Sequence, residues 1–185
     1  PSKSERYEIL DESIQIIRQL WSGPDQYFQG IHHQLSKATI SPRPTGSPSI
    51  LVGGNSQEIL NIAASKADAV NMVMPNHADL QRNKIYLDQK ADEYGRPSVQ
   101  LTTLERIVLG KTESEAHTKL NQLSPTITPP YRGLIGSTEN VVTKITDMQK
   151  YGVGTIYVFF EEEDEESYDL FERKIINEFY GSNTR

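Results

Sequence analysis

The stretch Ile50-Leu51-Val52-Gly53-Gly54-Asn55-Ser56-Gln57-Glu58 is the most informative part of the chain. A short apolar run passes through two glycines into a helix start, which predicts a buried strand that ends in a tight turn. The first amides of a helix lack intrahelical partners and carry a partial positive charge, so an anionic group is stabilised there. Glycine lets such a group approach the backbone closely. The stretch therefore suits an anionic cofactor.

Strand and helix patterns alternate along the rest of the chain. Apolar runs predict four strands, at residues 49–53, 69–74, 98–109 and 154–160. Apolar side chains at steps of three and four predict roughly six helices. The first helix lies between a Ser2–Glu5 capping box and Gly23-Pro24, and a second capping box, Thr112–Glu115, precedes the helix at 113–122. The other predicted helices lie at 56–66, at 78–94, between Ser137 and Gly152, and through Phe179 at the end of the chain. Such alternation produces right-handed crossovers and a parallel sheet in an α/β fold.

Residues 25–48 depart from this alternation. The segment 27–35 could form a small hairpin, and Pro42, Pro44 and Pro48 then favour an extended backbone. We expect a hairpin and a proline-rich excursion at the surface.

Composition limits the classes of function. With 185 residues, of which 36% are hydrophobic and 24% charged, the chain is typical of a globular protein. Its net charge of -6 disfavours nucleic acid and anionic membrane surfaces as partners, and no apolar run has the length of a membrane span. The sequence holds no cysteine, which excludes a disulfide framework and a thiolate zinc site and fits a cytoplasmic protein. We expect a small-molecule substrate.

Short motifs extend over nearly the whole chain. They are a helix at 5–21, an F-x-G-x-x-x-x-L pattern at 28–35, a proline-rich approach to a strand at 42–54, Ala63-Ala64 with Ala67-Asp68, and Gly136-Ser137-Thr138-Glu139-Asn140-Val141 followed by Gly152-Val153. In order and spacing they resemble the luciferase-like monooxygenase family, which includes flavin-dependent and deazaflavin-dependent (coenzyme F-420) oxidoreductases.

The resemblance implies that residues 1–185 are the C-terminal part of a single TIM-barrel domain, about half of a (β/α)8 barrel with four parallel strands and flanking helices. The family's first four strands, with most of its catalytic residues, would lie before Pro1, which looks like a cut end. The implied chemistry is hydride or oxygen transfer with FMN or coenzyme F-420 as cofactor. A homodimer is also expected, because dimers are common in the family.

Gly53, Gly54, Asn55 and Ser56 are the residues that the resemblance places at the cofactor phosphate. A structural reading stands beside it, because Asn55 with Glu58 has the spacing of a capping box and the glycines could serve only the turn. The two readings are compatible, since a cap and a phosphate use different N–H groups.

Asn71, Met74 and Asn76 lie on or just after the second predicted strand, at the strand end where barrel enzymes bind ligands. The structural alternative is that Met74 fills core space and Asn76 caps the next helix, and we favour it for Asn76.

Glu105 and Arg106 interrupt an apolar strand. They could pair inside the barrel mouth, but we expect a bend with both charges in water. Arg132, in the loop 129–133, is a candidate for binding an anionic substrate or a cofactor tail, because loops at that end of a barrel build such sites.

The histidines do not suggest a metal site. His32 and His33 are adjacent and would point to opposite faces of a strand, and His77 and His117 belong to helices. The acidic run 161–166 is expected to be solvated and to place negative charge at the start of the last helix.

Two alternative functions remain open. One is a noncatalytic flavin-binding or structural half-barrel, whose open strand edges and apolar face would drive dimerisation. The other is an unrelated phosphate-binding barrel enzyme, which would respond to neither flavin nor deazaflavin.

Overall fold

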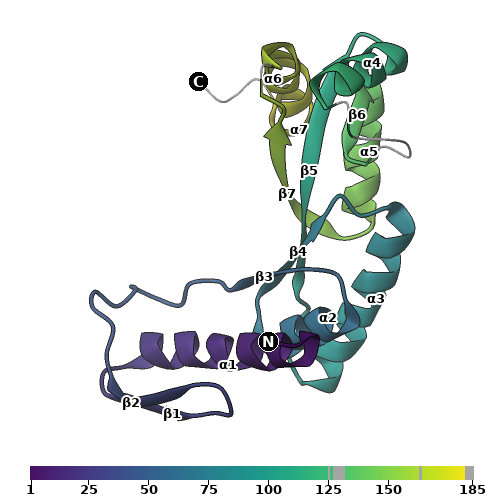
Figure 1. The fold of residues 1–185 in the computed structure, drawn as a ribbon. Coiled ribbons are helices and arrows are strands. Elements are labelled where there is room, and N and C mark those ends of the chain that lie inside the picture. Colours follow the sequence, from purple (N-terminus) through teal and green to yellow (C-terminus); the bar gives the residue numbers. More distant parts are fainter. Residues whose placement is uncertain (125, 127–131, 163, 182–185) are drawn as a thin grey trace. The chain divides into compact units, whose positions relative to one another are not determined.

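The computed structural model describes residues 1–124, 126, 132–162 and 164–181 (Figure 1). The chain forms two compact units, Pro1–Asn71 with Ile85–Gln100 and Met72–Lys84 with Leu101–Arg185. The elements are α1 (Lys3–Ser22), β1 (Gln26–Gln29), β2 (Gln34–Ala38), β3 (Leu51–Gly53), α2 (Gln57–Lys66), β4 (Ala69–Val73), α3 (His77–Glu93), β5 (Gln100–Gly110), α4 (Glu113–Leu123), β6 (Leu134–Ser137), α5 (Thr138–Lys150), β7 (Val153–Phe160), α6 (Glu165–Leu170), the π-helical segment η1 (Phe171–Ile176) and α7 (Asn177–Tyr180).

The first unit joins a strand–helix–strand motif to a long helix. β3 and β4 pair in parallel, with Val52 opposite Val70 and Gly53 opposite Asn71. Helix α1 packs on α2. The Ser2 hydroxyl accepts the backbone N–H of Glu5, and the Glu5 carboxylate accepts the backbone N–H of Ser2, which confirms that capping box.

One buried carboxylate fastens the hairpin of β1 and β2 to α1. The two strands pair in antiparallel fashion, which confirms the predicted hairpin. The carboxylate of Glu12, which is 7% exposed, accepts the backbone N–H groups of Ile31, His32 and His33. Burial raises the pKa of Glu12, but these hydrogen bonds outweigh burial and leave that pKa below its usual value. The hairpin loop therefore wraps around a charged carboxylate.

Gly30 permits this close approach, because a Cβ atom there would lie 2.4 Å from the carboxyl carbon of Glu12. We expect Gly30→Ala to displace the loop and to lower the free energy of unfolding by about 1–3 kcal/mol. Urea denaturation measures the change. The matched control is Gly53→Ala, whose Cβ would meet nothing within 4 Å. Equal losses in the two variants would contradict the role of Gly30.

β5 is the longest strand of the second unit. It pairs in parallel with β7 over Leu101–Ile107 and with β6 over Ile107–Gly110. The N–H of Met74, just after β4, donates to the carbonyl of Leu104 at 3.0 Å. Both α4 and α5 pack on β6. A buried cluster joins β5, α4 and β6: Val108, Ala116, Leu120 and Ile135.

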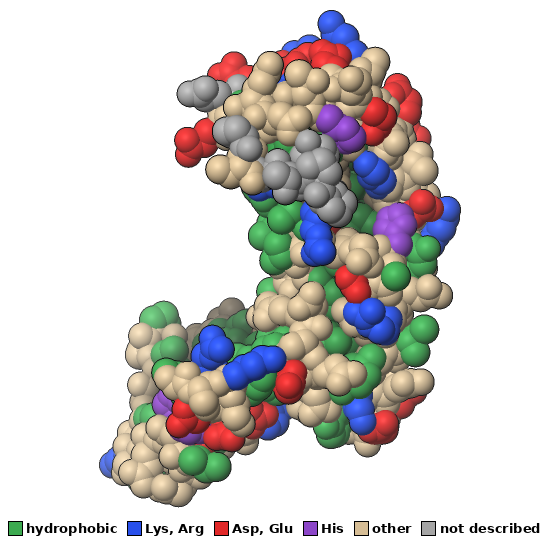
Figure 2. Space-filling model, turned by 45° about the vertical axis from the view of Figure 1, so that its right-hand side comes forward, with side chains coloured by type: hydrophobic (Ala, Val, Ile, Leu, Met, Phe, Trp, Pro, Cys, Tyr) green, Lys and Arg blue, Asp and Glu red, His purple; other side chains and the backbone are tan. Residues whose placement is uncertain are grey.

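The predicted α/β fold with a parallel sheet is confirmed, with two corrections. Leu134–Ser137 forms a strand, β6, that is not among the four predicted strands. The last helix is not one α-helix, because η1 interrupts it between α6 and α7. Among the described residues, no helix has both the length and the apolar character to cross a bilayer. Charges of both signs are interspersed on the face in Figure 2.

Candidate functional site

The turn after β3 joins the end of the strand to the N-terminus of α2. Gly53 ends the strand, and Gly54 (φ +133°) donates its N–H to the carbonyl of Asn71 at 2.9 Å. Ser56 is the N-cap of α2, and its hydroxyl accepts the N–H of Ile59. The cap is therefore Ser56, and the prediction that Asn55 caps this helix is wrong.

The space around this turn differs between its two glycines. A Cβ atom on Gly53 would meet nothing within 4 Å, whereas one on Gly54 would lie 3.2 Å from the side chain of Ile59. The hydroxyl of Tyr7 lies 3.0 Å from the Ser56 hydroxyl, so α1 supports the cap. Gly53 is the position where a group can approach the backbone without obstruction.

A carboxylate is already stabilised at this helix start. The pKa of Glu58 lies below its usual value, first because its own backbone N–H donates to it and second because the Ser56 side chain does. The first turn of α2 therefore favours negative charge, as expected of a helix N-terminus.

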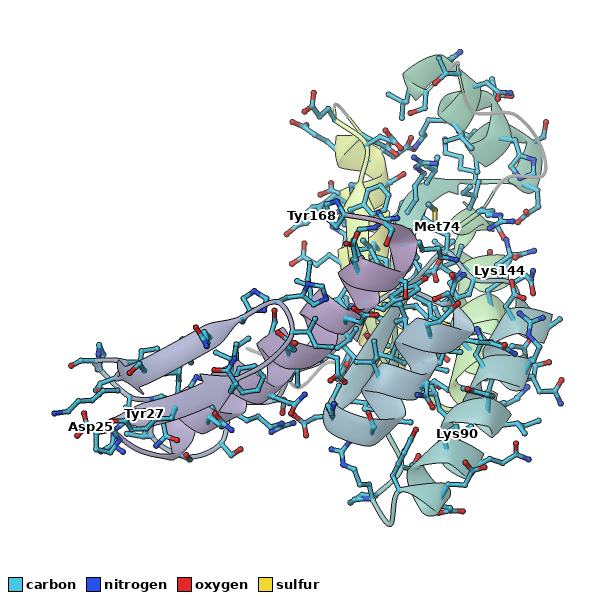
Figure 3. All side chains as sticks on the ribbon, turned by 60° about the horizontal axis from the view of Figure 1, so that its bottom comes forward. Asp25, Tyr27, Met74, Lys90, Lys144 and Tyr168 are labelled. Atoms are coloured by element: carbon cyan, nitrogen blue, oxygen red, sulfur yellow. The ribbon has the colours of Figure 1, made fainter. Side chains whose placement is uncertain are left out.

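The second unit contains a cavity of about 430 Å³ that collects several of the predicted candidates. Met74 and Lys144, both labelled in Figure 3, line it. Its other described lining residues are Pro75, Asn76, His77, Glu105, Arg132, Gly133, Leu134 and Met148. The structure thus brings together Met74, Asn76, Glu105 and Arg132 from separate parts of the sequence.

Glu105 is the most unusual group in this cavity. Its side chain lies in β5 and is 2% exposed, and within the described part of the chain its Oε1 atom has no hydrogen-bond partner. Burial raises the pKa of Glu105 to about 7, although Thr103 lowers it somewhat. A carboxyl group in this state changes its charge near neutral pH, which is common at functional sites.

Arg106 points to a different environment. Its Nε lies 2.5 Å from Oε1 of Glu161, and its guanidinium lies 5.5 Å from the centre of the Phe159 ring. The prediction that Glu105 and Arg106 both lie in water is therefore wrong: Glu105 is buried and Arg106 is paired.

The residues after β4 take mainly structural roles. The side-chain oxygen of Asn76 accepts the N–H of Asp79 at 2.8 Å, which confirms the predicted helix cap. The fully buried methionine is Met72, whereas Met74 is half-buried, has φ +42° and lines the cavity. Met74 therefore does not take the core-filling role that was its structural alternative.

Arg132 is exposed at the edge of this cavity. The other residues of its predicted loop, 129–131, lie outside the described residues, and Gly133 follows with φ +111°. Its proposed contact with an anionic ligand stays a prediction.

The histidines are dispersed over separate partners. His32 lies 2.8 Å from Glu8, His33 lies 3.1 Å from Glu12, and the ring of His77 lies 5.4 Å from that of Tyr151. Over the described ranges, no three histidine, aspartate or glutamate side chains gather as a metal site would require.

The acidic run is not fully solvated. Glu161 pairs with Arg106, and Asp164 is 6% exposed and accepts the N–H of Ser167 as the N-cap of α6. The expected negative charge at the helix start is present, but the prediction that the whole run is solvated is wrong.

Comparisons with known proteins agree with the fold. The profile of the family described as luciferase-like monooxygenase matches residues 2–156. Pyrimidine monooxygenase RutA of Acinetobacter baylyi is 30% identical over 120 residues, which cover 63% of this chain and 32% of that protein. F420-dependent glucose-6-phosphate dehydrogenase of Nakamurella multipartita is 34% identical over 68 residues, covering 37% of this chain and 20% of that protein. The matched segments thus cover about a third or less of the length of these relatives.

Two solved structures show the same fold. An F420-dependent secondary alcohol dehydrogenase in complex with an F420-acetone adduct has a TM-score of 0.79 at 16% identity, covering 94% of this chain and 62% of that one. Monooxygenase RslO1 of Streptomyces bottropensis has a TM-score of 0.77 at 20% identity, covering 96% and 63%. This chain corresponds to roughly three-fifths of each.

Proposed function

Because the chain belongs to the luciferase-like monooxygenase family, we propose that it is part of a flavin- or deazaflavin-dependent oxidoreductase and that its Gly53–Ser56 turn binds the cofactor phosphate. The observation that carries this assignment is the open backbone at Gly53 beside the N-terminus of α2. A phosphate there would receive backbone N–H groups and the positive end of the helix dipole.

Named relatives support these two cofactor classes as candidates. One relative is named as F420-dependent, and another, from Pseudomonas fluorescens, is an FMNH(2)-dependent dimethylsulfone monooxygenase. When bound, FMN or coenzyme F-420 supplies the hydride or oxygen transfer. The residues of this chain bind and orient: Gly53, Gly54, Asn55 and Ser56 hold the phosphate, and Arg132 holds an anionic part of a small substrate or of the cofactor. A homodimer is part of the same proposal.

We expect Gly53→Asp in the full-length protein to weaken FMN binding at least about tenfold, because the new carboxylate enters the space assigned to the phosphate. Flavin fluorescence titration measures the affinity. Riboflavin, which lacks the phosphate, should bind the variant and the parent equally. Gly53→Asn adds a side chain of the same size without charge, so it should lose less affinity for FMN than Gly53→Asp does.

The same titrations are repeated with coenzyme F-420 to identify the cofactor. An FMN or F-420 affinity that does not change in Gly53→Asp would exclude the phosphate assignment, as would an equal loss for FMN and riboflavin. A full-length protein that binds neither cofactor would contradict the proposed function as a whole.

A further inference from the structure

The cavity that contains Glu105 has few polar groups left for a ligand. Lys144 donates its Nζ to the carbonyl of Ile135 at 2.6 Å, and burial lowers its pKa. Asn76 is used as a helix cap, and the ring of His77 lies against that of Tyr151 in a tilted arrangement. These contacts hold three of the polar side chains in place within the protein.

Glu105 and Arg132 are different. Across the described residues, Oε1 of Glu105 has no hydrogen-bond partner and Arg132 forms no ion pair, so the two side chains do not pair with each other although they line one cavity. Leaving a buried carboxyl oxygen without a hydrogen-bond partner costs stability. Opposite charges that share a cavity without contact leave space for a ligand that contacts both.

We propose that this cavity binds a small zwitterion, an amino acid with an uncharged side chain. Its ammonium group would donate to the carboxylate of Glu105, and its carboxylate would accept hydrogen bonds from the guanidinium of Arg132. Pro75, Leu134 and Met148 supply apolar contacts for the side chain. The volume of about 430 Å³ lies within the usual range for small-molecule sites.

The charge arrangement disfavours simpler ligands. A plain anion would place its charge beside the ionised form of Glu105, and a plain amine would share the cavity with Arg132 and Lys144. A zwitterion places its positive group beside Glu105 and its negative group beside Arg132. The inference rests on the proposed role of Arg132 in ligand binding and is independent of the Gly53–Ser56 turn.

Calorimetric titration of the full-length protein with glycine, alanine, valine, leucine and methionine tests the proposal. We expect saturable binding of at least one of these. For an amino acid that binds, two analogues are compared: the amine that lacks its carboxylate and the carboxylic acid that lacks its ammonium group. Each analogue should bind at least about tenfold more weakly than the amino acid. For leucine these analogues are 3-methylbutylamine and 4-methylpentanoate. Failure of all five amino acids to bind, or analogues as tight as the parent, would overturn the proposal.

Variants test the roles of Glu105 and Arg132. Glu105→Gln and Arg132→Gln should each weaken binding of the amino acid at least about tenfold, and Glu105→Gln should leave the FMN and F-420 titrations unchanged. The controls Glu172→Gln and Arg173→Gln alter exposed charges in the same unit and should change neither binding. Unchanged amino-acid affinity in both test variants would overturn the site even if the cofactor binds as proposed. A thermal-denaturation curve of each variant separates lost binding from lost folding.

Discussion

Glu105→Gln is expected to raise the free energy of unfolding by about 3 kcal/mol at pH 8 and by less than about 1 kcal/mol at pH 5. The reason is the pKa of Glu105, which burial raises from 4.5 to about 7. Between these values the folded protein holds a proton that the unfolded chain has released, so stability falls as the pH rises. Above the folded pKa, the parent carries a buried charge that glutamine does not.

Urea denaturation of parent and variant from pH 5 to pH 8 measures this difference. The control is Glu172→Gln, because Glu172 is exposed on η1. Its stability difference from the parent should stay near zero across the range. A Glu105→Gln variant that is no more stable than the parent at pH 8 would show that the carboxyl group has a compensating partner in the folded protein.

The stability and binding effects of Glu105 should have opposite signs. Glutamine keeps the shape of the side chain but cannot carry the negative charge that an ammonium group needs. The variant should therefore be more stable and bind the amino acid less tightly. Such a trade-off is typical of a group kept for function, because a residue kept only for packing would not cost stability.

Local signals in the sequence predict the elements well. Ser2, Thr112 and Ser137 each cap the helix that follows them, and the structure confirms all three caps. The predicted strand at 69–74 is β4, which ends one residue earlier. A cap or an apolar run depends on residues close in sequence, so the pattern alone contains the information.

Contacts between segments that are distant in sequence cannot be predicted from such local patterns. The strand β6 exists because Leu134–Ser137 pairs with the far end of β5. Its four residues resemble the end of a loop in sequence. The cavity at Glu105 is likewise lined by segments far from it in sequence, including Leu134 and α5. The only sequence signal at Glu105 was a charge in an apolar strand, which fits a bend or a buried site equally well.

Lys119 in α4 joins three segments of the second unit. Its Nζ donates to the carbonyl of Leu109 at 2.6 Å and to carboxylate oxygens of Asp164 at 3.1 Å and Glu166 at 2.8 Å. The side chains of Lys119 and Asp164 are only 15% and 2% exposed. Burial lowers the pKa of Lys119, but the hydrogen bonds with Glu166 and Asp164 outweigh it, and the pKa lies above its usual value.

Lys119→Met is expected to lower the free energy of unfolding by about 3 kcal/mol at neutral pH, because Asp164 would keep a buried charge without its partner. Lys150→Met is the matched control, since the Lys150–Asp147 pair lies at the surface with 68% and 35% exposed side chains. It should cost less than about 1 kcal/mol. Urea denaturation measures both.

A second change separates the lost charge pair from lost packing. In the Lys119→Met background, Asp164→Asn removes the buried charge while an amide oxygen remains to accept the N–H of Ser167, the bond that caps α6. We expect it to recover at least about 1 kcal/mol of the loss, whereas the same change in the parent protein should destabilise. Lys119→Met losing no more than Lys150→Met, or Asp164→Asn recovering nothing, would mean that the cation on α4 does not compensate the buried carboxylate.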